Sequence, residues 1–207
     1  MLALAALSAR ALAEAAAREG VRAVALDVFG DADTRSHAAD WQPIGTPQAM
    51  RVDGDRFLAA LDALARRGEV RAWVAGSGFD GRPDLLEQGA ARLPLLCTAG
   101  ADVRRVREPQ EFFRVLEAHG IGFPPLAFEP PAAPAGWLAK EAGGCGGWQV
   151  RRATVADAPA PGRYWQRERR GAAMSATFVG NGRYVVLLGV NRQGTQALGD
   201  RPFVFTR

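Results

Sequence analysis

The chain has 207 residues, enough for one or two domains with a sizeable core, and its 48% hydrophobic and 23% charged content is ordinary for a globular protein. The net charge is +4, but the 25 arginines stand among 22 acidic residues in scattered pairs and form no long basic run, so we expect no nucleic-acid partner. With only two cysteines, the sequence excludes a disulfide framework and a cysteine-rich zinc site.

The first 28 residues predict a βαβ unit. Leu2–Leu7 is a short apolar strand, Ala11–Glu19 is rich in helix formers and is followed by Gly20, and Val21–Val28 is a second apolar strand. A strand, a helix and a strand in this order predict parallel pairing with a right-handed crossover.

The same start also bears on location. Residues 1–17 are alanine-rich, but they have no basic first region, and charged side chains recur at Arg10, Glu14 and Arg18, so we do not expect a secretion signal. No apolar stretch approaches the ~18 residues needed to cross a bilayer. We therefore expect a cytoplasmic protein with no membrane partner.

The alternation of strand and helix continues to about residue 100. The predicted elements are a helix at Asp55–Arg67, a strand at Val70–Ala75, a helix at Leu85–Arg92 and a strand at Leu93–Cys97. Such alternation favours an open parallel sheet. The sequence thus predicts a Rossmann-like parallel α/β domain over residues 1–103.

From residue 104 the pattern changes to mainly antiparallel strands. After a helix at Glu108–Gly120 and a proline-rich connector at 124–134, we predict strands at 137–141, 148–153 and 164–168 and strand-like residues at 203–205. Met174–Val179 and Arg183–Val190 flank Asn181-Gly182, a pair that favours a type I′ hairpin turn. Residues 104–207 are therefore predicted to form a partial α+β domain with antiparallel strands.

The single lysine of the chain, Lys140, stands directly before a glycine-rich stretch at 143–147. An ammonium group beside backbone with many accessible N–H donors suits a polyphosphate, and arginine would not replace it equally well. The alternative is chance, because one position had to hold the last lysine. We interpret Lys140 as a nucleotide-phosphate ligand.

Three stretches in order resemble the ATP-grasp superfamily. They are Val106-Arg107-Glu108-Pro109 opening a helix, Leu138-Ala139-Lys140 before Gly143–Gly147, and Tyr164–Gly171. The resemblance covers residues 104–191 as the first half of an ATP-grasp nucleotide-binding region, and residues 1–103 as the domain that precedes it. Within the superfamily the chain is most similar to bacterial ATP-dependent carboxylate–amine ligases, some of which are linked to tetrahydromethanopterin one-carbon metabolism.

The resemblance implies an ATP site. Lys140 and Arg107 would contact the phosphates, and adenine would meet the main chain of a hinge between two lobes. The loop over the phosphates would be formed by Gly143, Gly144, Cys145, Gly146 and Gly147, and the hinge by Gln166, Arg167, Glu168 and Arg169. The alternatives are a plain hairpin turn for the glycine loop and an ordinary edge strand for the hinge. Ala173 stands where many relatives have a ribose-binding glutamate.

The first domain would contribute to the site of the carboxylate or amine substrate. Ser8, Arg10, Gly76, Ser77 and Gly78 follow predicted strands, and open α/β sheets bind ligands at the carboxyl ends of strands. Asp27 ends the second strand as in dinucleotide-binding folds. No G-x-G-x-x-G motif precedes it, so an NAD-dependent oxidoreductase is a weaker interpretation.

The resemblance also implies Mg²⁺ alongside ATP. In the superfamily the glutamate and asparagine that hold it lie well beyond the central hairpin, whereas this chain stops at Arg207, so we assign no metal ligand. We expect a truncated or degenerate homologue of a ligase that joins a small carboxylate to an amine. A non-catalytic nucleotide-binding or interaction module is the alternative. A homodimer is the oligomer we consider.

Overall fold

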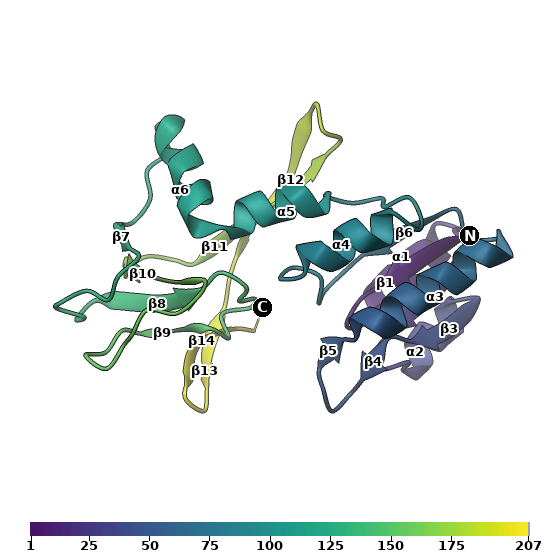
Figure 1. The fold of residues 1–207 in the computed structure, drawn as a ribbon, viewed down its shortest axis with the longest axis horizontal. Coiled ribbons are helices and arrows are strands. Elements are labelled where there is room, and N and C mark those ends of the chain that lie inside the picture. The colour runs from purple at the N-terminus through teal and green to yellow at the C-terminus, as the bar shows by residue number, and fades with distance from the viewer. Residues whose placement is uncertain (207) are drawn as a thin grey trace. The chain divides into compact units, whose positions relative to one another are not determined.

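The computed structural model describes residues 1–206, which form two compact units. Unit 1 is Met1–Arg107 and unit 2 begins at Glu108. Unit 1 contains a parallel sheet and unit 2 only antiparallel pairings, so the predicted α/β class with a partial antiparallel second part is confirmed (Figure 1). Within residues 1–206, no helix is both long enough and apolar enough to cross a bilayer.

Unit 1 is built on a four-stranded parallel sheet with the order β3-β2-β1-β6 (Figure 1). Its strands are β1 (Leu2–Ala5), β2 (Ala23–Asp27), β3 (Asp40–Pro43) and β6 (Ala72–Ala75). The predicted βαβ unit is confirmed by the parallel register of β1 and β2. The predicted strand at Leu93–Cys97 is reduced to one parallel bridge, between Leu95 and Trp73, because Pro94 has no N–H to give a ladder.

The helices of unit 1 are α1 (Arg10–Arg18), α2 (Ala32–His37), α3 (Gly54–Arg67), α4 (Pro83–Ala90) and α5 (Gly100–Arg107). Two short strands, β4 (Gly45–Thr46) and β5 (Arg51–Val52), pair with each other. At the start of α3, the Asp53 side chain accepts a hydrogen bond from the Arg56 N–H, and at its end Gly68 adopts a left-handed φ of 71°. These signals fix the limits of the helix that the sequence predicts here.

The sheet of unit 1 is covered on both faces. Ala3 and Ala5 of β1 join the cluster formed with α3 and α4, whereas Leu4 joins a second cluster that contains Ala9 and Ala13 at and within α1. This alternation follows from the period of two along a strand. Helices on both faces of a parallel sheet are the doubly wound architecture.

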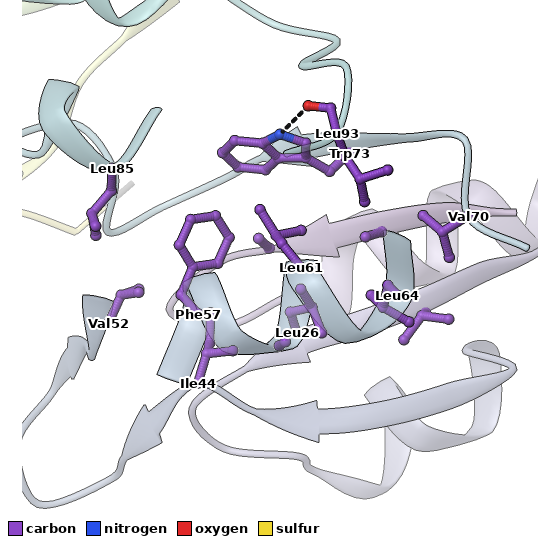
Figure 2. Packing of buried hydrophobic residues seen from close by; sticks show 14 of the residues in the cluster. Leu26, Ile44, Val52, Phe57, Leu61, Leu64, Val70, Trp73, Leu85 and Leu93 are labelled. Atoms are coloured by element: carbon purple, nitrogen blue, oxygen red, sulfur yellow. Dashed lines mark hydrogen bonds between the residues drawn. The ribbon is translucent and has the colours of Figure 1, made fainter. Parts of the chain in front are cut away.

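Aromatic rings form the centre of the first cluster (Figure 2). The ring of Phe57 lies 5.0 Å from that of Trp73 and 4.9 Å from that of Phe79, measured between centroids. Trp73 is fully buried, and its indole N–H donates to the Leu93 carbonyl at 3.1 Å. The polar end of the largest core side chain is therefore satisfied, as burial requires.

Unit 2 begins with α6 (Pro109–Ala118) and an antiparallel sheet of order β7-β10-β8-β9. The strands of this sheet are β7 (Leu126–Ala127), β8 (Trp137–Glu141), β9 (Val150–Arg152) and β10 (Arg163–Arg167). Two further antiparallel pairs follow, β11 (Met174–Gly180) with β12 (Val185–Arg192) and β13 (Thr195–Leu198) with β14 (Arg201–Phe205).

The hairpin of β11 and β12 is confirmed, but its predicted type I′ turn is wrong. Four residues connect the strands, and among them only Gly182 has a positive φ, 84°. The side-chain oxygen of Asn181 accepts hydrogen bonds from the N–H groups of Arg183 and Tyr184. Asparagine therefore acts here through its side chain, which stabilises a longer loop than the two-residue turn.

Candidate functional site

Lys140 lies in the middle of the unit 2 sheet. Its residue pairs with Tyr164 of β10, so Gln166, two positions further along β10, is a diagonal neighbour on the same face. The ammonium Nζ donates to Gln166 Oε1 at 2.7 Å. The side chain is half-buried, and this burial lowers the pKa of Lys140.

In the described part of the chain, no carboxylate pairs with this ammonium. Among residues 1–206, none of the ion pairs of unit 2 includes Lys140, and its hydrogen-bond acceptor is the neutral amide of Gln166. An ammonium group has three N–H donors. A partly desolvated cation without a counter-charge is energetically unfavourable, so this site favours the approach of an anion.

Lys140 borders a cavity of about 220 Å³ in unit 2. The charged residues around it are the cations Lys140, Arg151, Arg163 and Arg201 and the carboxylates Glu141 and Asp200. Arg163 pairs with Glu141 at 3.2 Å, and Arg201 lies 3.9 Å from Asp200. Cations therefore outnumber carboxylates along the lining.

Asp157 fixes one wall of this cavity. It accepts hydrogen bonds from Arg151 at 2.8 Å, from the Trp165 indole at 2.9 Å and from Thr154 at 2.9 Å, and its side chain is only 3% exposed. Burial alone would raise the pKa of this carboxyl, but these three donors together lower it from 3.8 to about 2. Asp157 thus stays ionised and holds the guanidinium of Arg151 in place.

The glycine loop connects β8 to β9, which pair with each other, so it is the connection of a hairpin, and Trp148 and Gln149, which follow it, line the cavity. Gly146 and Gly147 have positive φ values of 63° and 79°, which favour glycine. Gly143 lies in open space, and Gly144 is close to the Gln149 side chain. The N–H of Cys145 donates to Gln149 Oε1 at 3.1 Å, and the thiol is exposed.

β14 holds one end of this loop. The N–H of Phe205 donates to the carbonyl of Gly146 at 2.9 Å, and a Cβ on Gly147 would overlap the carbonyl oxygen of Phe203. The guanidinium of Arg201 lies 4.4 Å from the centre of the Trp148 ring. The part of the loop nearest β9 is therefore packed, whereas Gly143 is not.

Several backbone groups of the predicted hinge are already paired within unit 2. Gln166 is paired on both sides, with Leu138 and Leu126, and its amide side chain contacts Lys140. The N–H groups of Arg167 and Glu168 donate to the carbonyls of Pro125 and Gly136. β10 is an inner strand of its sheet, so the alternative of an edge strand is wrong.

The side chains of this segment point to other partners. Arg167 donates to the Ala135 carbonyl at 3.0 Å and lies over the Trp137 ring, and Glu168 pairs with Arg152 at 2.7 Å. Arg169 follows the strand and is exposed. An adenine contact at this position would depend on the Arg169 backbone and on carbonyl groups.

Arg107, the second predicted phosphate ligand, belongs to unit 1. It is the last residue of α5, and its guanidinium lies 3.4 Å from the carboxylate of Asp80. Arg107 thus belongs to a different unit from Lys140.

The predicted substrate residues of unit 1 lie at the carboxyl ends of β1 and β6. The N–H of Leu7 donates to the Ser77 carbonyl at 2.6 Å, and Gly78, with a φ of 94°, approaches the Leu7 side chain. Ser8 and Gly76 are thereby on adjoining loops, and Arg10 is exposed, 3.9 Å from Asp33. From these two strands the chain passes to opposite faces of the sheet, and such a switch point is where open α/β sheets bind ligands.

The carboxylate of Asp27 accepts hydrogen bonds from groups within unit 1. Its fully buried carboxylate accepts hydrogen bonds from the N–H groups of Ala9 and Gly30 and from the Trp41 indole, at 3.1, 2.8 and 2.6 Å. Ala9 is the N-cap of α1, the position where a dinucleotide-binding fold holds its pyrophosphate. A carboxylate at this position disfavours a phosphate, which agrees with the missing glycine motif.

The arginines around the unit 2 cavity were not predicted from the sequence. Arg163 could have been found, because the antiparallel register of β8 and β10 places it opposite Glu141. Arg201 follows Lys140 by 61 positions, and no local pattern links them. Within residues 1–206, no group of three histidine, cysteine or carboxylate side chains could hold a metal ion.

Comparisons with known proteins give matches among solved structures alone. The sequence matches no protein-family model and no curated protein. The biotin carboxylase domain of the Hydrogenobacter thermophilus 2-oxoglutarate carboxylase, solved as a dimer with MgADP, ADP and bicarbonate, superposes with a TM-score of 0.72 and 12% identity over 97% of this chain and 51% of that one.

Two further structures are similar. The L-amino acid ligase of Bacillus licheniformis has a TM-score of 0.68 and 13% identity over 93% of this chain and 50% of its own. The carboxyaminoimidazole ribonucleotide synthase of Aspergillus clavatus, complexed with ATP, has a TM-score of 0.67 and 12% identity, over 94% and 54%. This chain spans about half the length of these structures.

All three are ATP-grasp superfamily members, and they share their fold with this chain over most of its length. At such low identity the likeness concerns the fold. This chain has the ATP-grasp fold over about half the length of these solved structures.

Proposed function

We propose that unit 2 binds the phosphate tail of ATP in the cavity beside Lys140. The observation that carries this proposal is the half-buried ammonium, which has the neutral Gln166 as its acceptor and no carboxylate partner among residues 1–206. A phosphate oxygen would supply the missing negative charge, and hydrogen bonds between charged groups are the strong ones.

The size of the cavity agrees with a phosphate group and not with a whole nucleotide. Its volume of about 220 Å³ lies below the roughly 300–1,000 Å³ of pockets that enclose drug-sized ligands. Arg163 and Arg201 are each already beside one carboxylate, but a guanidinium has five donors and keeps some for a second partner. In this proposal the nucleoside extends out of the cavity.

The parent reaction in our proposal is ATP-dependent ligation of a small carboxylate to an amine. When bound, ATP would supply the phosphoryl group that activates the carboxylate for attack by the amine. Lys140 would hold and orient the phosphates, and the glycine loop would limit the access of water. The likeness to an L-amino acid ligase and to ATP- and ADP-bound enzymes supports this proposal.

Three finer points stay predictions: the link to tetrahydromethanopterin metabolism, a homodimer, and Mg²⁺ as a partner of ATP. The described residues contain no suitable cluster of metal ligands, so we derive no step that passes through the metal. Ser8, Arg10 and the 76–78 loop are proposed to contact a substrate, because they meet at the switch point of the sheet.

Calorimetry with ATP tests the lysine. We expect Lys140→Met to weaken ATP binding at least about tenfold, because a charge-assisted hydrogen bond contributes about 1.5–3 kcal/mol. Lys140→Arg keeps the charge and should weaken binding less. Arg114→Met is the matched control, since it removes an exposed cation of unit 2 that lies on α6, outside the cavity.

The outcomes separate the two candidate functions. Equal ATP affinity for Lys140→Met and the unchanged protein, both folded by circular dichroism, would show that the phosphate assignment is wrong. Binding of ATP without hydrolysis or ligation in the presence of Mg²⁺ would favour the alternative, a non-catalytic nucleotide-binding module.

A further inference from the structure

Unit 1 contains a larger cavity that the proposed ATP site does not use. Its volume is about 400 Å³. It lies at the carboxyl end of β6 and beside the residues that follow Leu95, which forms a bridge to β6. This edge is the ligand-binding edge of an open parallel sheet. The volume falls in the range of small-molecule pockets.

The walls of this cavity are apolar. Phe79 and Leu86 belong to the buried core, and Val103 packs against that core from α5. Val106 also lines the cavity, yet its side chain is 59% exposed. An exposed valine facing a preformed hollow leaves apolar surface that a ligand would bury.

α4 and α5 hold the cavity open. Arg104 of α5 donates two hydrogen bonds of 2.9 Å to the carboxylate of Glu87 on α4. At Gly100, the first residue of α5, a Cβ would lie 2.5 Å from the Pro83 carbonyl oxygen. The two helices are therefore in close contact, and the cavity beside them is largely preformed.

The charges of the lining are mainly negative. Asp80 and Asp102 carry carboxylates, and Arg107 carries the one cation. Arg107 lies 3.4 Å from Asp80, and Asp102 lies 4.0 Å from Arg105, a residue outside the lining. In a chain whose net charge is +4, this cavity is thus a local site for a cation.

We propose that the unit 1 cavity binds a small apolar amine in its protonated form. The apolar body would contact Phe79, Leu86 and Val106, and the ammonium would approach Asp102 and Asp80. Binding itself does not depend on the ATP site. A role of this ligand as the amine substrate does rest on the proposed ligase function.

Both cysteines of the chain serve the test, because Cys97 lines this cavity and Cys145 lies in unit 2. Burial raises the pKa of the Cys97 thiol, and the residue is still exposed, so a maleimide can reach it. The rate of N-ethylmaleimide addition at each cysteine is measured by mass spectrometry without ATP. The probes are 2-phenylethylamine, L-phenylalanine and 3-phenylpropanoate, which share one apolar body and differ in charge.

We expect 2-phenylethylamine to slow the alkylation of Cys97, at a concentration about tenfold lower than 3-phenylpropanoate requires, and to leave Cys145 unchanged. Equal protection by L-phenylalanine would also support the proposal and would identify the amine as an amino acid. Stronger protection by the carboxylate, or no protection by any probe up to about 10 mM, would overturn it.

Single substitutions test where the ammonium group of the ligand binds. Asp102→Asn should raise the amine concentration needed for protection about fivefold, the factor of an ion pair near a surface. Asp62→Asn is the control, because Asp62 forms an ion pair with Arg92 of unit 1 outside the lining. Lys140→Met should leave the protection of Cys97 intact, so failure of the ATP site and failure of this proposal can be told apart. An unchanged response of Asp102→Asn, in a folded protein, would contradict the proposed position of the ammonium.

Discussion

Units 1 and 2 have apolar strands of similar composition, but they place the side chains differently. In unit 1 the strands β1, β2 and β6 lie between helices, and residues such as Ala5, Leu26 and Trp73 are fully buried. In unit 2, among residues 108–206, the buried apolar side chains are Pro109, Ala139, Trp165 and Val204. The hairpin of β11 and β12 is exposed on both faces.

Strand β12 of the hairpin contains a run of apolar residues that stays exposed. Val185, Val186, Leu187 and Leu188 follow one another in β12 and are 52–70% exposed. A run of consecutive apolar residues is typical of a strand buried on both faces, yet a strand gains such burial only where other layers cover it. In unit 1 the connecting helices supply these layers, because each crossover between parallel strands brings its own helix.

The largest expected effect is in the core of unit 1. Trp73→Ala removes the ring that packs against Phe57 and Phe79, and we expect a loss of about 3–5 kcal/mol in the free energy of unfolding, measured by urea denaturation. Trp148→Ala is the matched change in unit 2, where the ring is 46% exposed, and should cost less than about 1 kcal/mol. Equal losses would remove the contrast between the units.

An intermediate effect concerns the most buried carboxylate of unit 2. The pKa of Asp157 is lowered from 3.8 to about 2, so its ionised form stabilises the fold above pH 3.8, and this contribution is lost as the pH falls through about 2. Asp157→Asn should therefore cost about 2 kcal/mol near pH 7, and the difference from the unchanged protein should shrink toward pH 2 in thermal unfolding.

Asp200→Asn provides the control for this pH dependence, because its side chain is 97% exposed. It should change the unfolding free energy little at either pH. If Asp157→Asn had the same pH profile as Asp200→Asn, the three donors around Asp157 would contribute no stability to unit 2.

The smallest expected effect is in the hairpin. Leu188→Asn replaces a side chain that is 61% exposed, so the unfolding free energy should change by no more than about 0.5 kcal/mol. The same change at the fully buried Leu61 of unit 1 should cost several times more, because it leaves an amide in an apolar core. A loss above about 1 kcal/mol for Leu188→Asn would show that the hairpin is covered in solution.

The sequence predicts the elements with strong local signals. The βαβ start, the helix α3 and the β11–β12 hairpin all follow from apolar periodicity and turn residues. α2 and β3 were missed because they are short and polar, with sequences such as Asp40–Pro43 that show no apolar alternation. The strand predicted at 93–97 is reduced to a single bridge, because Pro94 has no N–H to donate.

The candidate site was less predictable than the fold. Lys140 and its glycines stand together in the sequence, so they could be selected as a group. The contact between Lys140 and Gln166, which are 26 positions apart, depends on the register of β8 and β10. The unit 1 cavity depends on how α4 and α5 pack, and no single segment contains the residues that form it.

The hydrogen bond from Phe205 to Gly146 has a mechanical consequence. Because the carbonyl of Gly146 already accepts a hydrogen bond from β14, and Gly147 has no room for a side chain, that end of the loop and the strand must shift together. Gly143, at the other end, can change its conformation alone. A rearrangement around a bound anion would then begin near Gly143 and reach Gly147 only by drawing β14 along with it.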